Sequence, residues 1–285
     1  MSAPRQGKPL PLPALRRSRP TREPWQRPYF RARHIIAAPK PFVSSGPVRI
    51  ITAADGGPVR HIFNYRSHCS TFATFSGKAA RQQYCESATE MAAAQDAEMK
   101  TEYVDLQFQP ARLEWLQPNG KWRSYTFDAA FELQNGTLVF DEYKATARQF
   151  SKPDVKAKMK AAIKVMGDYG IKVRLRNASH LQNRPEHAAV TALWAIRRTT
   201  VADVDVDKAR QIIEAAGGAA QLGQLLEKLH SDRHMALGIG AALMMRRTIR
   251  IDLSGGLTPN AIVTIPPEVT RGRLRRFLAQ FAEVL

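Results

Sequence analysis

Two largely apolar runs that predict β-strands lie within residues 125–144, and an Asn-Gly pair separates them. Two such runs on either side of Asn-Gly predict a β-hairpin. A three-residue loop would place Asp128 opposite Glu142, with Lys144 on the same face, whereas a two-residue turn would place Asp128 opposite Tyr143. The pattern therefore predicts two carboxylates and an ammonium group together, if the loop is the longer one or a bulge corrects the register. The alternative is a surface hairpin whose charges are solvated.

Residues 84–100 are rich in alanine, methionine, glutamate and glutamine, which favour helix. Ser87 is suited to the start of this helix. Glu86 and Glu90 lie four positions apart, so both would project from one helical face if the helix begins early enough. The ordinary role of such glutamates is a solvated acidic face. The helix nevertheless adds candidate carboxylates to those of the hairpin.

The surrounding segments predict further strands and a second helix. Strands are expected over 48–54, over 59–66, and on both sides of a Gln109-Pro110 turn within 104–128. The helix follows Lys144, with Ser151 as its N-cap and Pro153 in its first turn, and leads to a strand over 171–177. Its expected buried side chains are Ala161, Ile163, Val165 and Met166. Its lysines either contact phosphates or are simply solvated: Lys152, Lys156, Lys158, Lys160 and Lys164. These elements predict a mixed α/β core.

Beyond Asn177 the pattern becomes mostly helical and ends in two strands. Helices are expected over 187–199, 206–217, 219–230 and 235–246, and strands over Thr248 to Leu253 and Ala261 to Ile265. Three helices closed by a hairpin are typical of a winged helix. The helix over 235–246 is apolar apart from its end, so we expect it to dock protein rather than to read bases.

The last segment has apolar residues at helical spacing, flanked by arginines. The stripe consists of Leu274, Phe277, Leu278, Phe281 and Leu285. A basic amphipathic helix of this kind either lies in a groove on a partner or packs onto its own domain.

Composition narrows the functional classes. The 285 residues carry a net charge of +18 with a pI near 10.3, which indicates a polyanionic partner, most simply nucleic acid. Half of this charge lies in residues 1–47, which hold ten Lys or Arg, one acid and ten prolines. We expect an extended arm there, with Trp25, Tyr29 and Phe30 either stacking on bases or packing on the protein.

The sequence does not predict a zinc-binding, membrane-spanning or secreted protein. Cys69 and Cys85 form no CxxC pair and have no histidine partner at metal spacing, so a structural zinc site is not expected and a reducing cytoplasm fits. The apolar run Met235 to Met245 is too short to span a bilayer. No apolar segment with a cleavage site opens the sequence, so we expect no secretory signal.

The hairpin carries the most specific chemistry. Carboxylates suit hard divalent cations such as Mg²⁺, and a neighbouring lysine can stabilise or orient an anion. These groups are suited to cutting a phosphodiester with metal-activated water.

The order of these parts resembles the PD-(D/E)xK nucleases, and more narrowly the TnsA endonuclease subunit of bacterial transposons. The stretch ESATE resembles the family's acidic segment, FQPARLEWLQPNGKWRSYTFD its QP…dG…Y-x-x-D segment, and VFDEYK its closing strand. The resemblance covers residues of about 45 to 175. It implies catalytic roles for Glu90, Asp128, Glu142 and Lys144, with the three acids as ligands of Mg²⁺, for which Mn²⁺ substitutes.

The resemblance also implies partners and a place of action. It implies cleavage of the 5′ strand ends of a transposon in double-stranded DNA, with a TnsB-type transposase subunit and a TnsC-type AAA+ ATPase regulator. The expected location is the bacterial cytoplasm at the nucleoid, with no membrane partner. Phe127 stands where the family has proline, and Tyr143 where it has a small aliphatic residue. Asp141 is expected on the opposite face from Glu142 and is not a predicted ligand.

The predicted fold is a mixed α/β, restriction-endonuclease-like nuclease core followed by a mainly helical, winged-helix-like C-terminal domain. The predicted units are a basic proline-rich arm (1–47), a PD-(D/E)xK nuclease domain (48–177), a winged-helix-like domain (178–268) and an amphipathic partner-binding helix (269–285). Two other functions remain open: a nuclease of restriction or repair acting alone, and a catalytically silent DNA-binding assembly factor.

Overall fold

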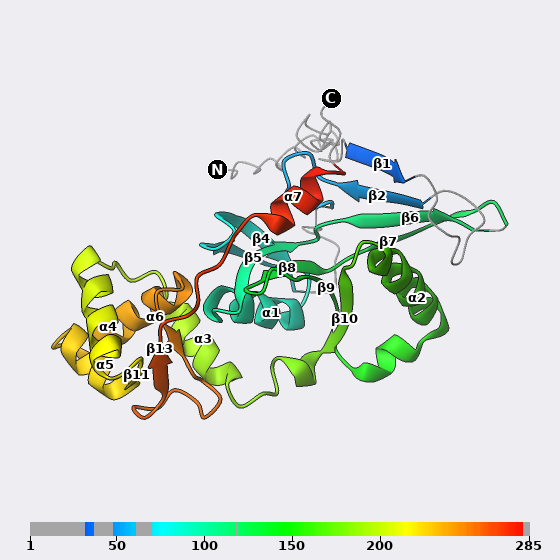
Figure 1. The fold of residues 1–285 in the computed structure, drawn as a ribbon. Coiled ribbons are helices and arrows are strands. Elements are labelled where there is room, and N and C mark those ends of the chain that lie inside the picture. The colour runs from blue at the N-terminus through cyan, green and yellow to red at the C-terminus, as the bar shows by residue number, and fades with distance from the viewer. Residues whose placement is uncertain (1–31, 37–47, 61–69, 118, 282–285) are drawn as a thin grey trace, which may run out of the picture.

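A computed structural model describes the backbone of residues 32–36 and the full residues 48–60, 70–117 and 119–281. Within these residues the chain is a mixed α/β protein with several sheets and seven α-helices, which confirms the coarse fold class (Figure 1). The predicted strand over 59–66 lies largely outside the described residues. The three aromatic residues of the arm and Cys69 lie wholly outside them.

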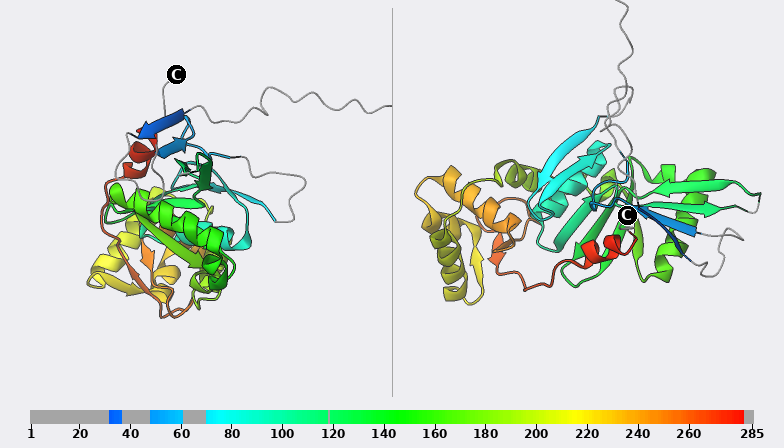
Figure 2. Two further views of the ribbon diagram at one scale, coloured as in Figure 1. Left: turned by 90° about the vertical axis from the view of Figure 1, so that its right-hand side faces the viewer. Right: turned by 90° about the horizontal axis from the view of Figure 1, so that it is seen from above.

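The central sheet has the strand order β10-β9-β8-β5. Its strands are β5 (Tyr103–Phe108), β8 (Ala129–Leu133), β9 (Leu138–Lys144) and β10 (Lys172–Asn177). The first three pair antiparallel, and β10 pairs parallel with β9 after the crossover helix α2 (Pro153–Asp168). Helix α1 (Ala88–Met99) and helix α2 pack into two different apolar clusters, one on each face of the sheet (Figure 2). The mixed α/β core is therefore present.

The β8–β9 hairpin has the longer of the two predicted loops. Ala129 pairs with Asp141, and the same register brings Asp128 opposite Glu142. Leu133 N donates to Thr137 O at 2.9 Å, and Gly136 has a φ of 75°. A glycine in the left-handed region closes a three-residue loop with a bulge.

Asp128 lies between two sheets rather than within one long strand. The second sheet has the order β1-β2-β6-β7, and β7 (Trp122–Thr126) ends before Phe127. Gln109 N donates to Asp128 O at 2.8 Å, and Phe127 N donates to Ala111 O at 3.1 Å. Two neighbouring chain segments therefore cross together from one sheet to the other. The other strands of this sheet are β1 (Ala32–Ile36), β2 (Val48–Thr52) and β6 (Arg112–Leu116).

Several local predictions need correction. Strand β1 belongs to the predicted arm, yet it forms an edge of the second sheet. A hairpin of β3 (Phe72–Ser76) and β4 (Arg81–Cys85) precedes α1 and was not predicted. Helix α2 begins at Pro153, but its N-cap is Lys152, because Ser151 ends a preceding 3₁₀ helix, η2 (Ala147–Ser151). Ile163 is 45 % exposed, whereas Ala161, Val165 and Met166 are buried as predicted.

The C-terminal lobe, residues 178–265, contains the predicted helices and the closing hairpin. Its helices are α3 (His187–Ile196), α4 (Asp203–Ala215), α5 (Leu222–Leu229) and α6 (Arg233–Met245). Its sheet has the order β11-β13-β12, formed by β11 (Ala219–Gln221), β12 (Arg250–Ile251) and β13 (Ile262–Thr264). The short strand β11 was not predicted.

Helix α6 is buried by its own chain. It packs on α3, α5 and the end of α1. A Cβ on Gly238 would lie 2.4 Å from Thr199 Oγ1, so glycine permits the close approach. With this apolar face covered, α6 does not present a free recognition helix.

The C-terminal helix α7 (Arg273–Ala279) packs on the central sheet, which corrects the prediction that its apolar stripe is free for a partner. Leu274 and Leu278 are buried among the side chains of β8, β9 and α2. Polar contacts anchor the same helix: Leu274 N donates to Glu132 Oε2 at 2.9 Å, and Arg275 forms two bonds with Asp105 at 2.8 and 3.1 Å. The packing onto its own chain is thus the observed one (Figure 1).

Candidate active site

The hairpin brings three of the four predicted residues together. Asp128 and Glu142 are 7 % and 4 % exposed. They face each other one residue beyond the first pair of β8 and β9, which is Ala129 with Asp141. Lys144 Nζ forms an ion pair with Glu142 Oε1. The alternation of side chains along β9 puts Glu142 and Lys144 on one face, as the sequence predicts. These three side chains form the centre of the candidate site.

Asp128 is held in place by the backbone of β9. Its Oδ2 accepts a hydrogen bond from Tyr143 N at 2.8 Å. Burial raises the pKa of Asp128 well above its usual range, and the negative charges of Glu142 and Glu90 raise it further. Lys144 acts in the opposite direction but does not balance them. Asp128 therefore sits where added positive charge would be favourable.

Glu142 has a partner on each carboxylate oxygen. Tyr125 donates its hydroxyl to Glu142 Oε2 at 2.5 Å, and Lys144 contacts Oε1. Burial alone would lower the pKa of Lys144, but the charges of Glu142 and Asp128 outweigh this effect and raise it. Lys144 is therefore a protonated cation at neutral pH, 27 % exposed at the edge of the site. Its Nζ also donates to Tyr143 O at 3.1 Å.

Glu90 reaches the site from α1, where it is also part of the helix cap. Ser87 is the N-cap, and its hydroxyl accepts from Glu90 N at 3.2 Å. The Glu90 carboxylate accepts in return from Ser87 Oγ at 3.0 Å and from Glu86 N at 2.9 Å, in the manner of a capping box. Burial raises the pKa of Glu90 to about 7, although these hydrogen bonds oppose the rise.

Cys85 is a buried thiol next to the candidate site. Cys85 has no exposed surface, and burial raises its pKa well above the usual value. The charges of Glu90 and Asp128 raise it further. Cys85 therefore lies near both carboxylates, at the end of β4.

Glu86 does not share a helical face with Glu90, because α1 begins at Ala88. Instead its carboxylate forms an ion pair with Arg60, whose Nε donates to Gln109 Oε1 at 2.8 Å. Arg60 thus ties the segment after β2 to Glu86 and to Gln109, whose backbone N donates to Asp128 O. Glu86 is therefore a structural neighbour of the site.

Asp141 points away from the site, as expected. It forms a bidentate ion pair with Arg174 at 2.6 and 2.9 Å, and it accepts the Tyr143 hydroxyl at 2.8 Å. Its charge is compensated on the α1 face of the sheet.

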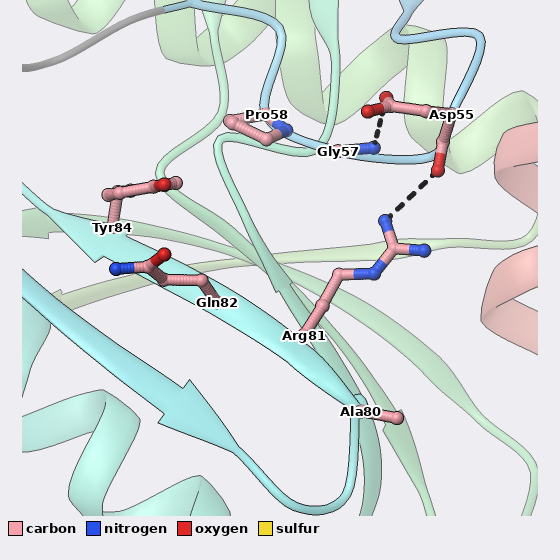
Figure 3. A pocket seen from close by; sticks show the side chains of 7 residues that line it. All are labelled: Asp55, Gly57, Pro58, Ala80, Arg81, Gln82 and Tyr84. Carbon is pink, nitrogen blue, oxygen red and sulfur yellow. Dashed lines mark hydrogen bonds between the residues drawn. The ribbon is translucent and has the colours of Figure 1, made fainter.

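A hollow of about 360 Å³ lies between the loop after β2 and strand β4 (Figure 3). Its lining consists of Asp55, Gly57, Pro58, Ala80, Arg81, Gln82 and Tyr84. Arg81 donates to Asp55 O at 3.2 Å and also to Gly56 O, which fastens the loop to β4. Within the described residues, this lining includes none of the four predicted site residues, so the hollow is a neighbouring feature.

The chemistry of the donor set fits a hard divalent cation, because Glu90, Asp128 and Glu142 are carboxylates buried at one end of the sheet. Among the described residues, however, no group of three or more His, Cys, Asp or Glu side chains has its donor atoms gathered as a ready metal site. Glu142 contacts Lys144 and Tyr125, and Glu90 contacts the start of α1. The three-ligand set of Glu90, Asp128 and Glu142 therefore stays a prediction.

Tyr125 is the residue of the site that was not predicted, although it is the tyrosine of the Y-x-x-D segment. It is 8 % exposed and packs edge-on against Phe127, with ring centroids 4.8 Å apart. A tyrosine three residues before a candidate aspartate was the available signal. Its role follows only from the bend between β7 and β8.

Comparisons with known proteins identify no family. No family model matches the chain, and no curated protein matches its sequence. None of the described helices combines the length and apolar character needed to cross a bilayer.

Proposed function

We propose that this protein is a Mg²⁺-dependent DNA endonuclease, and more narrowly a TnsA-type subunit of a heteromeric transposase that cleaves the 5′ strand ends of a transposon. The observation that carries the proposal is the register of β8 and β9, which sets Asp128 against Glu142 with Lys144 on the same face. The order of α1, three antiparallel strands, α2 and a parallel strand supports it further.

Each residue has a role that its surroundings support. Glu90, Asp128 and Glu142 would hold one or two Mg²⁺ ions, with Mn²⁺ substituting. When bound, the cation supplies Lewis-acid activation of water and neutralises charge on the phosphate. Lys144, protonated and partly exposed, orients the attacking water or stabilises negative charge on the phosphate. Tyr125 fixes the rotamer of Glu142 through its 2.5 Å hydrogen bond.

The rest of the molecule supports a role within an assembly. The net charge of +18 suits double-stranded DNA. The order of α4, β11, α5, α6 and the β12–β13 hairpin resembles a winged helix, and the burial of α6 disfavours base reading by that helix. The C-terminal lobe is therefore proposed to contact protein partners, namely a TnsB-type transposase subunit and a TnsC-type AAA+ regulator, at the bacterial nucleoid.

The proposal is tested by nicking of DNA that carries the transposon ends, with Mg²⁺ or with EDTA, in the presence of a TnsB-type and a TnsC-type partner subunit. Asp128→Ala and Lys144→Ala are expected to abolish strand cleavage while leaving the far-ultraviolet circular dichroism unchanged. Full cleavage by both variants would remove the site assignment.

One observation favours the silent assembly factor. Glu90 caps α1 with both carboxylate oxygens, a structural role that needs no metal. The variant Glu90→Gln keeps an oxygen for the cap and removes the charge. Loss of cleavage with unchanged far-ultraviolet circular dichroism would support a ligand role, whereas full cleavage would leave Glu90 as a cap and would exclude the silent assembly factor.

A further inference from the structure

The lysines of α2 divide into two groups that the sequence does not distinguish. Lys158 pairs with Asp154 and Lys164 pairs with Asp168, each at 3.2 Å and one helical turn away. Lys152, Lys156 and Lys160 are exposed, and within the described residues they form no ion pair. Only the second group keeps its positive charge uncompensated.

The uncompensated lysines form a row that begins beside the candidate site. Residues four apart lie on one helical face, so Lys152, Lys156 and Lys160 follow one another over about 12 Å of helix. At the site end, exposed Arg148 of η2 and Lys152 line one hollow of about 370 Å³ with Thr146, Gln149 and Ser151. Thr146 is two residues beyond Lys144. We call Arg148, Lys152, Lys156 and Lys160 the basic row.

The opposite side of α2 is fixed on the core. Met159, Ala161, Ala162, Val165 and Met166 are buried against the central sheet. The helix can therefore not roll, and the basic row keeps its position relative to Lys144. Figure 1 shows α2 on the outside of the molecule beside β7 and β10, where a large ligand has access.

We propose that the basic row binds the sugar–phosphate backbone of double-stranded DNA and leads the duplex away from the carboxylate site along α2. This inference rests on the proposed function for the identity of the polyanion. Each strand of a duplex carries a phosphate about every 3.4 Å along the axis, so the row spans roughly three to four phosphates of one strand. Point charges without aromatic or amide side chains suit backbone contacts rather than base reading.

The test compares two double variants of the full chain in an Asp128→Ala background, which prevents cleavage during binding. Lys156→Gln/Lys160→Gln removes two charges of the basic row, and Lys158→Gln/Lys164→Gln removes two charges already paired with aspartates. Both carry the same substitution on the same helix, and glutamine is as good a helix former as lysine. Fluorescence anisotropy of a labelled duplex gives the slope of log Kobs against log salt concentration.

The row variant is expected to lower the magnitude of this slope by about 2, since each lost phosphate contact removes about 0.9. The paired-lysine variant is expected to change it by less than half as much. Equal changes in both variants, or no change in either, would overturn the basic row. Binding to phosphatidylserine vesicles that falls only in the row variant, with DNA binding unchanged, would overturn it in favour of a membrane surface.

Nicking by the chain with intact Asp128, measured with Mg²⁺ and the partner subunits, separates this inference from the proposed function. If only the row variant weakens DNA binding and the chain shows no nicking, the basic row is supported and the proposed nuclease function is contradicted. If the chain nicks DNA but the two double variants bind DNA equally well, the nuclease function is supported and the basic row is contradicted.

Discussion

Asp128, Glu142 and Glu90 bury their carboxyl groups at one end of the sheet, each less than 10 % exposed. Lys144 pairs with Glu142 alone among them. Burying a charge without full compensation disfavours the ionised form and so the folded state. Asp141, one residue from Glu142, is equally buried but is matched by Arg174. Asp128, whose pKa is raised by burial and by the charges of Glu142 and Glu90, thus differs from Asp141, whose charge a buried ion pair matches.

We predict that Asp128→Asn abolishes strand nicking, a fall of at least about a thousand-fold, while the melting temperature stays the same or rises. The charge that it removes is the one whose pKa burial and like charges raise. Asparagine can still accept the hydrogen bond from Tyr143 N. Differential scanning fluorimetry of the metal-free protein and a plasmid-nicking assay provide the two measurements.

Asp141→Asn is the matched control. It leaves Arg174 without its bidentate partner in a part-buried position, so we expect a loss of about 3 kcal/mol in the free energy of unfolding. Nicking should persist below its lowered melting temperature. Equal destabilisation by both substitutions would show that Asp128 is a structural residue.

The titration of Glu90 predicts how stability depends on pH without metal. Its folded pKa of about 7 lies above the ordinary value of 4.5, so the folded state holds the proton more tightly than the unfolded state does. The stabilisation is fully present below pH 4.5 and is lost as pH rises to about 7. A shift of this size corresponds to roughly 3 kcal/mol.

Urea unfolding at pH 5 and at pH 7.5 measures this effect. Between these two pH values, the free energy of unfolding of the natural chain should fall by about this amount more than that of Glu90→Gln, because glutamine does not titrate. Mg²⁺ should raise the stability of the natural chain at pH 7.5 more than that of the variant. Parallel pH profiles for the two proteins would contradict the assignment of this shift to Glu90.

At the scale of elements, the sequence predicted the hairpin but left two registers open, and it did not predict the path of the chain into the hairpin. The structure has the three-residue loop, which sets Asp128 against Glu142 rather than Tyr143. The crossing at Phe127 was missed because apolar and polar residues alternate through it without a break. The β3–β4 hairpin was missed because its turn contains no proline and depends on Ala80, a non-glycine residue at a φ of 51°.

The sequence was a weaker guide to the burial of side chains, because tertiary contacts decide which of them are buried. Ile163 is apolar at a helical spacing, yet it lies on the exposed face of α2. Tyr125 became a site residue only through the bend between the two sheets. The stripe of α7 was compatible with a partner or with its own core, and a single sequence contains nothing to separate these. The sequence therefore indicated four candidate residues, whose roles stay a prediction, but it did not indicate the contacts that they make.

Helix α7 provides a prediction at this scale. Leu274 has no exposed surface and packs in the central cluster, so Leu274→Ala should cost about 2 to 5 kcal/mol of unfolding free energy. Arg276 is exposed on the same helix, and Arg276→Ala should change stability by no more than about 0.5 kcal/mol. Urea denaturation measures both. Unchanged stability of Leu274→Ala together with lost binding of a partner would restore the free-helix prediction.

At the scale of the whole molecule, the two predicted domains share their packing. Met99 at the end of α1 is buried in the apolar cluster of the C-terminal lobe. Asp96 pairs with Arg184 at 2.6 Å, and Lys100 bridges Asp96 and Glu186 at 3.2 Å. After the last strand the chain runs back across the surface, and α7 joins the core (Figure 2). Side chains on the two sides of the boundary predicted near residue 177 therefore pack against each other.

We predict that residues 48–177 alone do not fold to a stable unit, because the fragment lacks the apolar side chains of α7 and uncovers Met99. It should show no cooperative urea transition by tryptophan fluorescence, whereas the full chain should give coincident fluorescence and circular dichroism transitions. A synthetic peptide of residues 268–281, added in excess, should restore part of the fragment's transition by binding the folded state. The same peptide with Leu274→Ala should not. A fragment that unfolds cooperatively alone, with stability unaffected by either peptide, would show that the nuclease-like core is an independent domain and that α7 only rests on it.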